Sequence, residues 1–244
     1  MNLSFTEKTA IGNKRKSNED YYGNCYNKII DAHLFCLADG MGGYEAGEHA
    51  SRIAVESVIK DFSLLTQKDL DPEILVACFF ENAQNRLRYY KVNNNISRFG
   101  TTLAVLIFFD HSTVCANLGD TRIYSFSENL LTQESYDHTE IEELIRCGII
   151  TRQEAAQHSR QHVLTGALTG ENQTVTPHIK KLIDKPDCTF LIASDGLYRM
   201  VKDNIILQIL THSNIEEAGA ELLQEALKSG GEDNITLQII TNKK

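Results

Sequence analysis

The sequence is divided into short apolar segments rich in β-branched residues, and this division constrains the fold more than any other feature. Each segment has the length of a strand and is bounded by glycine, aspartate or asparagine, so each is predicted to be a buried strand. Residues 235–240 add a final strand in which apolar and polar residues alternate, with one mostly buried face. The segments predicted as buried strands are His33–Ala38, Thr101–Phe109, Thr113–Leu118, Arg122–Phe126 and Cys188–Ala193.

Helical segments separate these strands into groups. Residues 45–62 and residues 214–228 have the apolar spacing of amphipathic helices. A further helix is predicted to begin at Asp71, its N-cap, with Pro72 at the first helical position. The order of strands and helices lacks the regular alternation of a Rossmann protein, so we expect an α+β fold with largely antiparallel sheets. Because the 244 residues include only three prolines and no low-complexity linker, we expect one domain over residues 1–244.

The composition excludes several classes of protein. There are 33 acidic and 24 basic side chains, and the net charge of −9 disfavours a nucleic-acid partner, because a duplex binder needs a basic surface. The longest apolar run, Leu103–Phe109, is far shorter than a membrane span, and the N-terminus lacks the features of a secretory signal. The six cysteines form no CxxC pair, which indicates reduced thiols. We expect a cytoplasmic monomer that binds neither nucleic acid nor a membrane.

Acidic residues stand at the ends of the predicted strands. A single Asp-Gly pair after a strand is more often a turn than a ligand, but here five distant segments place a carboxylate at an apolar boundary. Clustered carboxylates repel one another unless cations compensate them, and oxygen ligands without a Cys or His spacing are typical of Mg²⁺ or Mn²⁺. The five segments that place a carboxylate at an apolar boundary are Asn18-Glu19-Asp20, Asp39-Gly40, Gly119-Asp120, Asp195-Gly196 and Glu232-Asp233-Asn234.

The glycine-rich segment after Asp39 has the spacing of a phosphate-binding P-loop between Gly42 and Gly47. Glu48-His49 stands where such a loop needs lysine followed by serine or threonine, so we reject that interpretation. We interpret the segment instead as a tight turn that presents Asp39 and the carbonyl group of Gly40 and then begins a helix.

Eight motifs follow one another along nearly the whole chain: Gly12-x-x-Arg15-x-x-Asn18-Glu19-Asp20, Ala38-Asp39-Gly40-Met41-Gly42-Gly43, Gly100-Thr101-Thr102, Gly119-Asp120-Thr121-Arg122, Leu131-Thr132, Asp137-His138-Thr139, Ser194-Asp195-Gly196-Leu197 and Asp233-Asn234-Ile235-Thr236. In this order they resemble the motifs of the PPM (PP2C) family of metal-dependent serine/threonine phosphatases in its compact bacterial form. One such motif would be weak evidence, whereas eight in order are very specific.

The resemblance implies a central β-sandwich of two antiparallel sheets flanked by pairs of helices, with a binuclear Mn²⁺ or Mg²⁺ centre at one end. By matching position, Asp39 is expected to bridge both ions. Asp195 and Asp233 are expected to complete one metal site, and the carbonyl group of Gly40 the other.

The resemblance also implies roles around this centre. Glu19 and Asp20 are expected to act mainly by holding waters on the ions, and Arg15 is expected to bind the phosphate group of the substrate. A third, weaker ion is expected at Asp120 together with Asp195.

The implied activity is hydrolysis of phosphoserine and phosphothreonine in proteins, the products of a serine/threonine kinase. Two cations lower the pKa of a water molecule and offset charge on the phosphoryl oxygens, so no covalent phosphoenzyme is required. Residues from about 137 to 170 are expected to form a flap subdomain beside the active site. Two alternatives stay open: a catalytically silent module that binds phosphoproteins, and a metal-dependent phosphatase of small phosphorylated metabolites.

The chain departs from the family pattern at two places that bear on mechanism. Met41 stands where eukaryotic members have histidine, and Tyr44 where some bacterial relatives have it, so we expect that no single histidine is essential. After Asp195-Gly196-Leu197 the family usually continues with Trp-Asp, whereas this chain has Tyr198-Arg199. The lost carboxylate is expected to weaken the third metal site.

Overall fold

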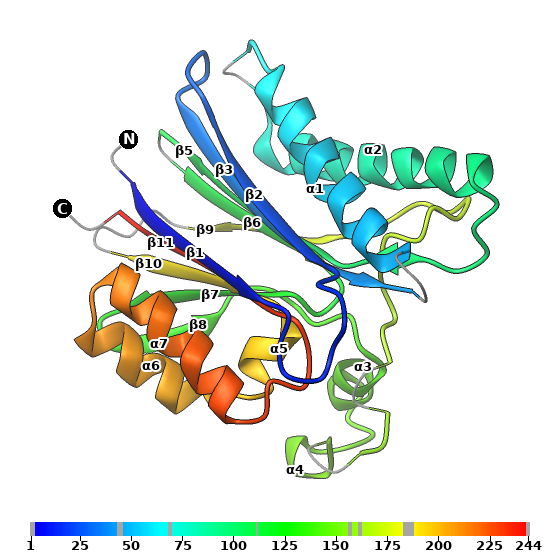
Figure 1. Cartoon of the computed structure of the whole chain (residues 1–244). Coiled ribbons are helices and arrows are strands. Elements are labelled where there is room, and N and C mark those ends of the chain that lie inside the picture. Colours follow the sequence, from blue (N-terminus) through cyan, green and yellow to red (C-terminus); the bar gives the residue numbers. More distant parts are fainter. Residues whose placement is uncertain are drawn as a thin grey trace.

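The chain folds into two stacked β-sheets with helices on both outer faces (Figure 1). The computed structural model describes residues 3–42, 46–67, 70–110, 112–155, 158–160, 163–182 and 188–242. Every strand pair in this part of the chain is antiparallel. The predicted α+β sandwich of two antiparallel sheets is therefore confirmed.

The first sheet, sheet A, contains strands from both ends of the chain. In spatial order its strands are β1 (Ser4–Ala10), β11 (Ile235–Thr241), β10 (Thr189–Ala193), β7 (Arg122–Ser127) and β8 (Leu130–Gln133). Because β1 and β11 are neighbours along their whole length, the segment that follows β1 and the segment that precedes β11 lie at the same end of the sheet.

The second sheet, sheet B, is built from the remaining strands. In spatial order these are β2 (Asp20–Asn27), β3 (Ala32–Met41), β5 (Leu103–Phe109), β6 (Ser112–Leu118) and β9 (His178–Leu182), and the short β4 (Gly100–Thr101) pairs with the end of β3.

The sequence of β3 shows why it occupies the middle of the sandwich. Successive side chains of a strand point to opposite faces. Leu34, Cys36 and Ala38 therefore contact the helices outside sheet B, whereas Phe35 and Leu37 lie in the core between the two sheets. A continuous apolar run is what a strand buried on both faces requires.

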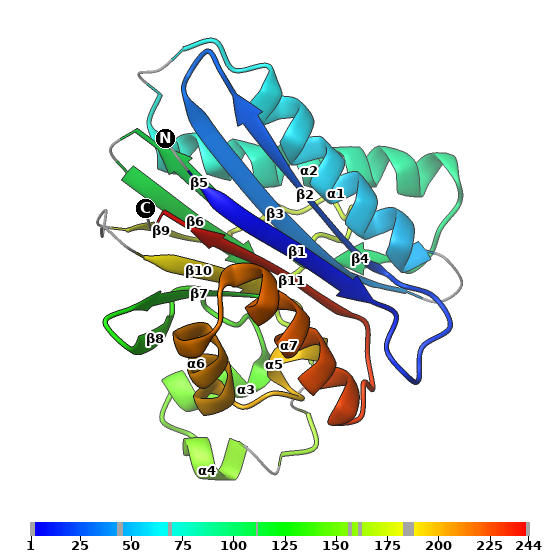
Figure 2. The ribbon, with the colours of Figure 1, turned by 60° about the vertical axis from the view of Figure 1, so that its left-hand side comes forward.

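Helices cover the outer face of each sheet, as Figure 2 shows. The helices α1 (Ala46–Ser63) and α2 (Pro72–Asn93) pack on sheet B, and α5 (Asp195–Tyr198), α6 (Asp203–His212) and α7 (Ile215–Lys228) pack on sheet A. The predicted cap of α2 is confirmed, because the Asp71 carboxylate accepts hydrogen bonds from two N–H groups of the first turn. Two short helices, α3 (Glu140–Arg146) and α4 (Arg152–Ala155), lie to one side of the sandwich.

Two predicted strands differ from the structure at the end of sheet B. β3 continues through Asp39, Gly40 and Met41 by pairing with β4, so the turn toward α1 comes later than predicted. The predicted strand over residues 101–109 is divided in two at Thr102, whose hydroxyl accepts a hydrogen bond from the Asp39 N–H.

The last strand of sheet A, β11, is buried on both faces rather than mostly on one.

Some sequence predictions concern features away from the sheets. Gly43 and Tyr44 lie outside the described residues. In the part of the chain that the structure describes, no helix is long and apolar enough to cross a membrane. The six cysteines form no disulfide in the described part of the chain, and Cys36, Cys115 and Cys188 are buried.

Candidate active site

A cavity of about 890 Å³ opens at the end of the sandwich where β3 and β10 finish. No histidine is among the described residues that line it. The buried Asp20, which is 7% exposed, does not line it either. The other predicted site residues all line this cavity: Arg15, Glu19, Asp39, Gly40, Asp120, Asp195 and Asp233.

Asp39 is fixed at the end of β3 by contacts on both sides. It is the ladder partner of Asp20 in β2. Its N–H group donates to the Thr102 hydroxyl at 2.8 Å, and its carbonyl group accepts from the Thr102 N–H at 2.9 Å. The Thr102 and Thr121 hydroxyls lie 2.6 Å apart, which ties this point to the residue after Asp120. Two threonines thus set the position of Asp39 relative to Asp120.

Gly40 allows two other segments to approach the end of β3. A Cβ atom here would lie 2.2 Å from the carbonyl oxygen of Gly47 in α1 and 2.6 Å from that of Glu19, so a larger residue does not fit. The Gly40 N–H donates to the Glu19 carbonyl at 3.1 Å, and the Ser51 hydroxyl donates to the same oxygen at 2.6 Å. These contacts hold Glu19 beside Asp39 and the first turn of α1.

The loop before β2 is tied to the loop before β11, and this tie brings Arg15 to Asp233. Gly12 has a φ of 81°, and a Cβ atom there would lie 2.2 Å from the Asp233 carbonyl oxygen. The Asn234 side-chain amide donates to two carbonyl groups of the first loop, each at 2.9 Å. In this arrangement Arg15 Nη2 donates to Asp233 Oδ2 at 2.6 Å.

Ser194 joins the carboxylates of the two sheets. Its hydroxyl donates to Asp20 Oδ2 at 2.8 Å and accepts from the Thr236 N–H at 3.0 Å. Asp195 follows directly, as the first residue of α5. Buried hydrogen bonds therefore connect the start of β2 in sheet B to the end of β10 in sheet A.

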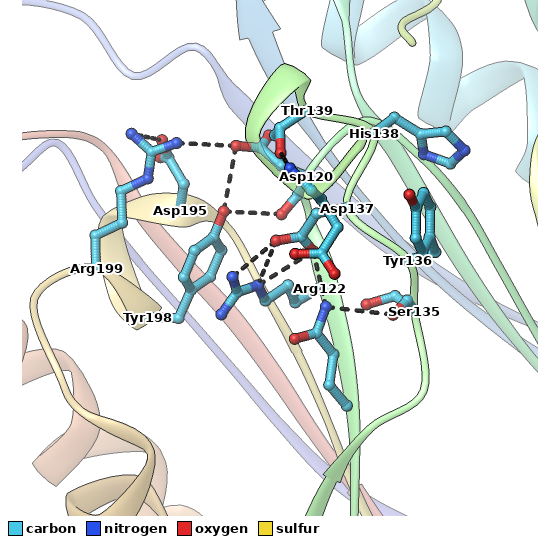
Figure 3. A network of polar contacts seen from close by, with 12 residues as sticks. Asp120, Arg122, Ser135, Tyr136, Asp137, His138, Thr139, Asp195, Tyr198 and Arg199 are labelled. Carbon is cyan, nitrogen blue, oxygen red and sulfur yellow. Dashed lines mark hydrogen bonds and ion pairs between the residues drawn. The ribbon is translucent and has the colours of Figure 1, made fainter. Parts of the chain in front are cut away.

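Asp120 belongs to a network of polar contacts that Figure 3 shows at close range. Asp120 Oδ2 accepts from Arg199 Nη2 at 3.0 Å and from the Tyr198 hydroxyl at 3.2 Å. The second terminal nitrogen of Arg199, Nη1, lies 3.3 Å from Asp195 Oδ2. One guanidinium group thus contacts two of the predicted metal ligands.

The same network reaches the segment that was predicted as a flap. Arg122 contacts Asp137 Oδ2 through Nε at 3.0 Å and through Nη2 at 2.7 Å. Its guanidinium group also lies 3.8 Å from the centre of the Tyr198 ring, within the range of a cation–π contact. Arg122 therefore connects the first residue of the segment to the tyrosine that contacts Asp120 (Figure 3).

Burial and mutual repulsion raise the pKa values of the buried carboxyl groups Asp20, Asp39 and Asp195. Burial is the largest cause of the raised pKa of Asp20, Asp39 and Asp195. For Asp39 the negative charges of Asp20, Asp195, Asp120 and Asp233 add to it, in that order. A site that disfavours its own negative charge is stabilised by a bound cation.

The donor atoms fit a hard divalent cation. Asp20 Oδ1 and Asp195 Oδ1 are buried and have no hydrogen-bond partner among the described residues. A buried acceptor without a partner costs free energy, and carboxylate oxygens are the donors that Mg²⁺ and Mn²⁺ prefer. The described residues form no ready-made cluster of three His, Cys, Asp or Glu side chains, and Asp120, Asp195 and Asp233 are paired with arginines instead.

Sequence reasoning assigns no role to three residues that hold this site in place. Thr102 positions Asp39, Ser194 positions Asp20, and Asn234 accepts a hydrogen bond from the Glu19 N–H at 2.8 Å. Each lies within one of the motifs and carries a side chain that can bond a backbone group or a carboxylate. That combination is the sequence signal that could have identified them.

Known proteins resemble the chain over nearly its whole length. Residues 12–230 match the family described as protein phosphatase 2C. The serine/threonine phosphatase stp of Listeria welshimeri is 32% identical over 238 residues, which cover 96% of this chain and 93% of that protein. The solved structure of serine/threonine phosphatase Stp1 from Staphylococcus aureus has a TM-score of 0.91 at 30% identity. The matched region covers 100% of this chain and 96% of the Stp1 chain.

A second solved structure carries metal. It is the catalytic domain of the serine/threonine protein phosphatase PstP in complex with 2 manganese ions, with a TM-score of 0.82 at 28% identity. The matched region covers 98% of this chain and 97% of the PstP chain. On the match to the family and the similarity to these relatives, the chain belongs to the protein phosphatase 2C family.

Proposed function

We propose that this chain removes phosphate from serine and threonine side chains of proteins that a serine/threonine kinase has phosphorylated. Its family and its relatives make it a serine/threonine phosphatase. The observation that carries the proposal is the cavity in which Arg15 faces carboxylates from both sheets. A guanidinium group beside ligands for hard cations is suited to hold a phosphate group for hydrolysis.

Two divalent cations, Mn²⁺ or Mg²⁺, are the cofactors in this proposal. Asp39 would bridge both ions, Asp195 and Asp233 would complete one site, and the Gly40 carbonyl group the other. Two observations support these roles: Asp39 is surrounded by the carboxylates of both sheets, and Asp195 Oδ1 has no partner among the described residues.

Glu19 and Asp20 would act around these ligands by holding water molecules. Glu19 lines the cavity, whereas Asp20 is buried beside Asp39, with Oδ2 bonded to Ser194. Asp20 Oδ1 has no partner among the described residues and would accept a hydrogen bond from such a water.

Bound cations lower the pKa of a water molecule and offset charge on phosphoryl oxygens, so hydrolysis needs no covalent phosphoenzyme. The planar guanidinium of Arg15 would bind two phosphate oxygens. Because the Arg15 side chain is 51% exposed and contacts Asp233 through one nitrogen, it can exchange that carboxylate for the substrate phosphate. Arg15 would thus bind phosphate when Asp233 serves as a ligand.

Residues from about 137 to 170 would form a flap that contacts the protein substrate beside the cavity. Leu164 lines the cavity, and Thr139 and Leu164 form an isolated bridge that closes the base of the segment. Between them α3 and α4 extend to one side of the sandwich (Figure 1). A side chain of a folded protein would reach the carboxylates past this segment.

The test is hydrolysis of a phosphothreonine peptide and of p-nitrophenyl phosphate with Mn²⁺, Mg²⁺ or EDTA. We expect turnover with metal, none in EDTA, and a loss on the order of 10³-fold or more in Asp39→Asn and Asp233→Asn. The matched control is Glu56→Gln, which removes one negative charge from an exposed ion pair on α1 and should keep the wild-type rate.

Two outcomes would favour the alternatives. Faster turnover of a small sugar phosphate than of the phosphopeptide would indicate a metabolite phosphatase. A folded protein that binds Mn²⁺ but turns over neither substrate would indicate a phosphoprotein-binding module. The monomeric state and the cytoplasmic location stay predictions from the sequence.

A further inference from the structure

The side chain of Arg199 lies between the two carboxylates that were expected to hold a third metal ion. Its Nη2 donates to Asp120 Oδ2 at 3.0 Å, and its Nη1 lies 3.3 Å from Asp195 Oδ2. Figure 3 shows the guanidinium group bridging these carboxylates. The side chains of Asp120 and Asp195 are only 7% and 14% exposed, so their charges are poorly compensated by solvent.

The local backbone explains why Arg199 reaches this position. Asp195 and Arg199 are the first residue and the C-cap of α5, and the Arg199 N–H donates to the Asp195 carbonyl at 3.0 Å. Residues four positions apart lie on the same side of a helix, so the Arg199 side chain turns toward Asp195. The single turn of α5 thus places the Arg199 guanidinium beside the carboxylate of its first residue, Asp195.

Neighbouring side chains hold the arginine and its partners in place. The Tyr198 hydroxyl lies 3.2 Å from Asp120 Oδ2 and donates to the Asp120 carbonyl at 3.0 Å. The Tyr198 ring lies against the guanidinium of Arg122, which in turn binds Asp137. Asp120 Oδ2 therefore accepts a hydrogen bond from Arg199 and lies within hydrogen-bond distance of the Tyr198 hydroxyl.

These contacts do not fit a third divalent cation. A cation at this point would have to displace Arg199 from both carboxylates and would be repelled by the guanidinium while that group stayed nearby. The guanidinium already supplies positive charge to two buried carboxylates, and its planar fork contacts both through separate nitrogens.

We infer that Arg199 is a built-in cation that takes the place of the third metal ion, so that this chain binds two divalent cations and not three. The inference rests on the proposed two-metal centre and adds a statement about its composition. The Asp120 side of the cavity then keeps the same charge at every metal concentration, and it is joined through Tyr198 and Arg122 to the base of residues 137–170.

The test is the number of Mn²⁺ ions bound per chain, measured by equilibrium dialysis of metal-free protein with elemental analysis. We expect two ions in the wild type at saturation. Arg199→Asp places a carboxylate where the cation was, so we expect three ions there, the third binding more weakly than the others. Arg199→Gln removes the charge without adding a carboxylate and serves as a second variant, in which we also expect the weak third ion.

Two controls separate charge and fold from the specific position. Arg199→Lys keeps a cation beside Asp120 and Asp195, so it should bind two ions. Arg52→Asp makes the same charge change in an exposed ion pair on α1 and should also bind two. Circular dichroism of each metal-free variant establishes that it is folded before ions are counted.

The outcomes distinguish this inference from the proposed function. Three ions in the wild type, or two ions in both folded variants Arg199→Asp and Arg199→Gln, would overturn the inference and leave the two-metal centre intact. A wild-type chain that binds no Mn²⁺ and shows no turnover would overturn the proposed function together with the inference.

Discussion

Two corners of the cavity place an arginine beside a carboxylate, yet the two arginines are held differently. At the first corner Arg15, on the loop before β2, bonds Asp233 through one nitrogen and is 51% exposed. At the second corner Arg199, at the end of α5, contacts both Asp120 and Asp195 and is 25% exposed. We therefore expect the first arginine to exchange its partner for a substrate and the second to stay bound to its two carboxylates.

The largest effect that this comparison predicts is on catalysis at the first corner. Arg15→Ala should lower kcat/KM for a phosphothreonine peptide on the order of 10²-fold, because the variant loses a charged donor to the phosphoryl group. The free energy of unfolding of its metal-free form should lie within about 1 kcal/mol of the wild-type value, because exposed ion pairs contribute little to stability. Steady-state kinetics and thermal unfolding in EDTA measure the two quantities.

Lys16→Ala is the matched control, because it removes one exposed positive charge from the same loop. It should keep kcat/KM within a few fold of the wild type, as expected for loss of long-range attraction alone. An equal loss in Lys16→Ala and Arg15→Ala would contradict a specific contact between Arg15 and the phosphate.

The second corner should show the opposite balance. Arg199→Ala leaves Asp120 and Asp195 without their cation, and loss of one partner from a largely buried ion pair is strongly destabilising. We expect the metal-free variant to be about 2 kcal/mol less stable, which corresponds to a melting temperature lower by about 4–8 °C for a chain of this size. Thermal unfolding in EDTA measures this, and a melting temperature equal to that of Arg15→Ala would remove the distinction between the corners.

Most of the fold could be predicted because strand and helix periodicity are local properties of the sequence. The exception at Asp39 arises where a local signal and a distant contact disagree. Asp-Gly is a common turn pair, but pairing with β4, about 60 residues later, keeps Gly40 and Met41 in a strand. Thr102 also fits the apolar strand pattern around it, and periodicity cannot reveal its contact with Asp39.

The site could be predicted in part. Carboxylates at the ends of buried strands indicate convergence, and those of Asp39, Asp120, Asp195 and Asp233 do line one cavity. The contact of Asp20 with Ser194 was not predictable, because the two residues are 174 positions apart along the chain. The contact of Arg199 with Asp120 likewise joins residues 79 positions apart. The sequence therefore showed an arginine in place of a carboxylate, but not that this arginine contacts Asp120.

The smallest predicted effect separates stability from catalysis at Asp39 itself. In metal-free protein this buried carboxylate is repelled by its neighbours, so Asp39→Asn should be more stable than the wild type in EDTA by about 1 kcal/mol, although we expect it to be inactive. Because the native pKa of Asp39 is raised, the native state keeps a proton that the unfolded chain loses, and the contribution of Asp39 to stability falls as the pH rises above about 4. The advantage of the variant should therefore grow between pH 5 and pH 8, whereas Glu56→Gln should show no such trend. Thermal unfolding at both pH values measures it, and a variant less stable than the wild type at pH 8 would show that the carboxylate stabilises the fold rather than serving the metal centre.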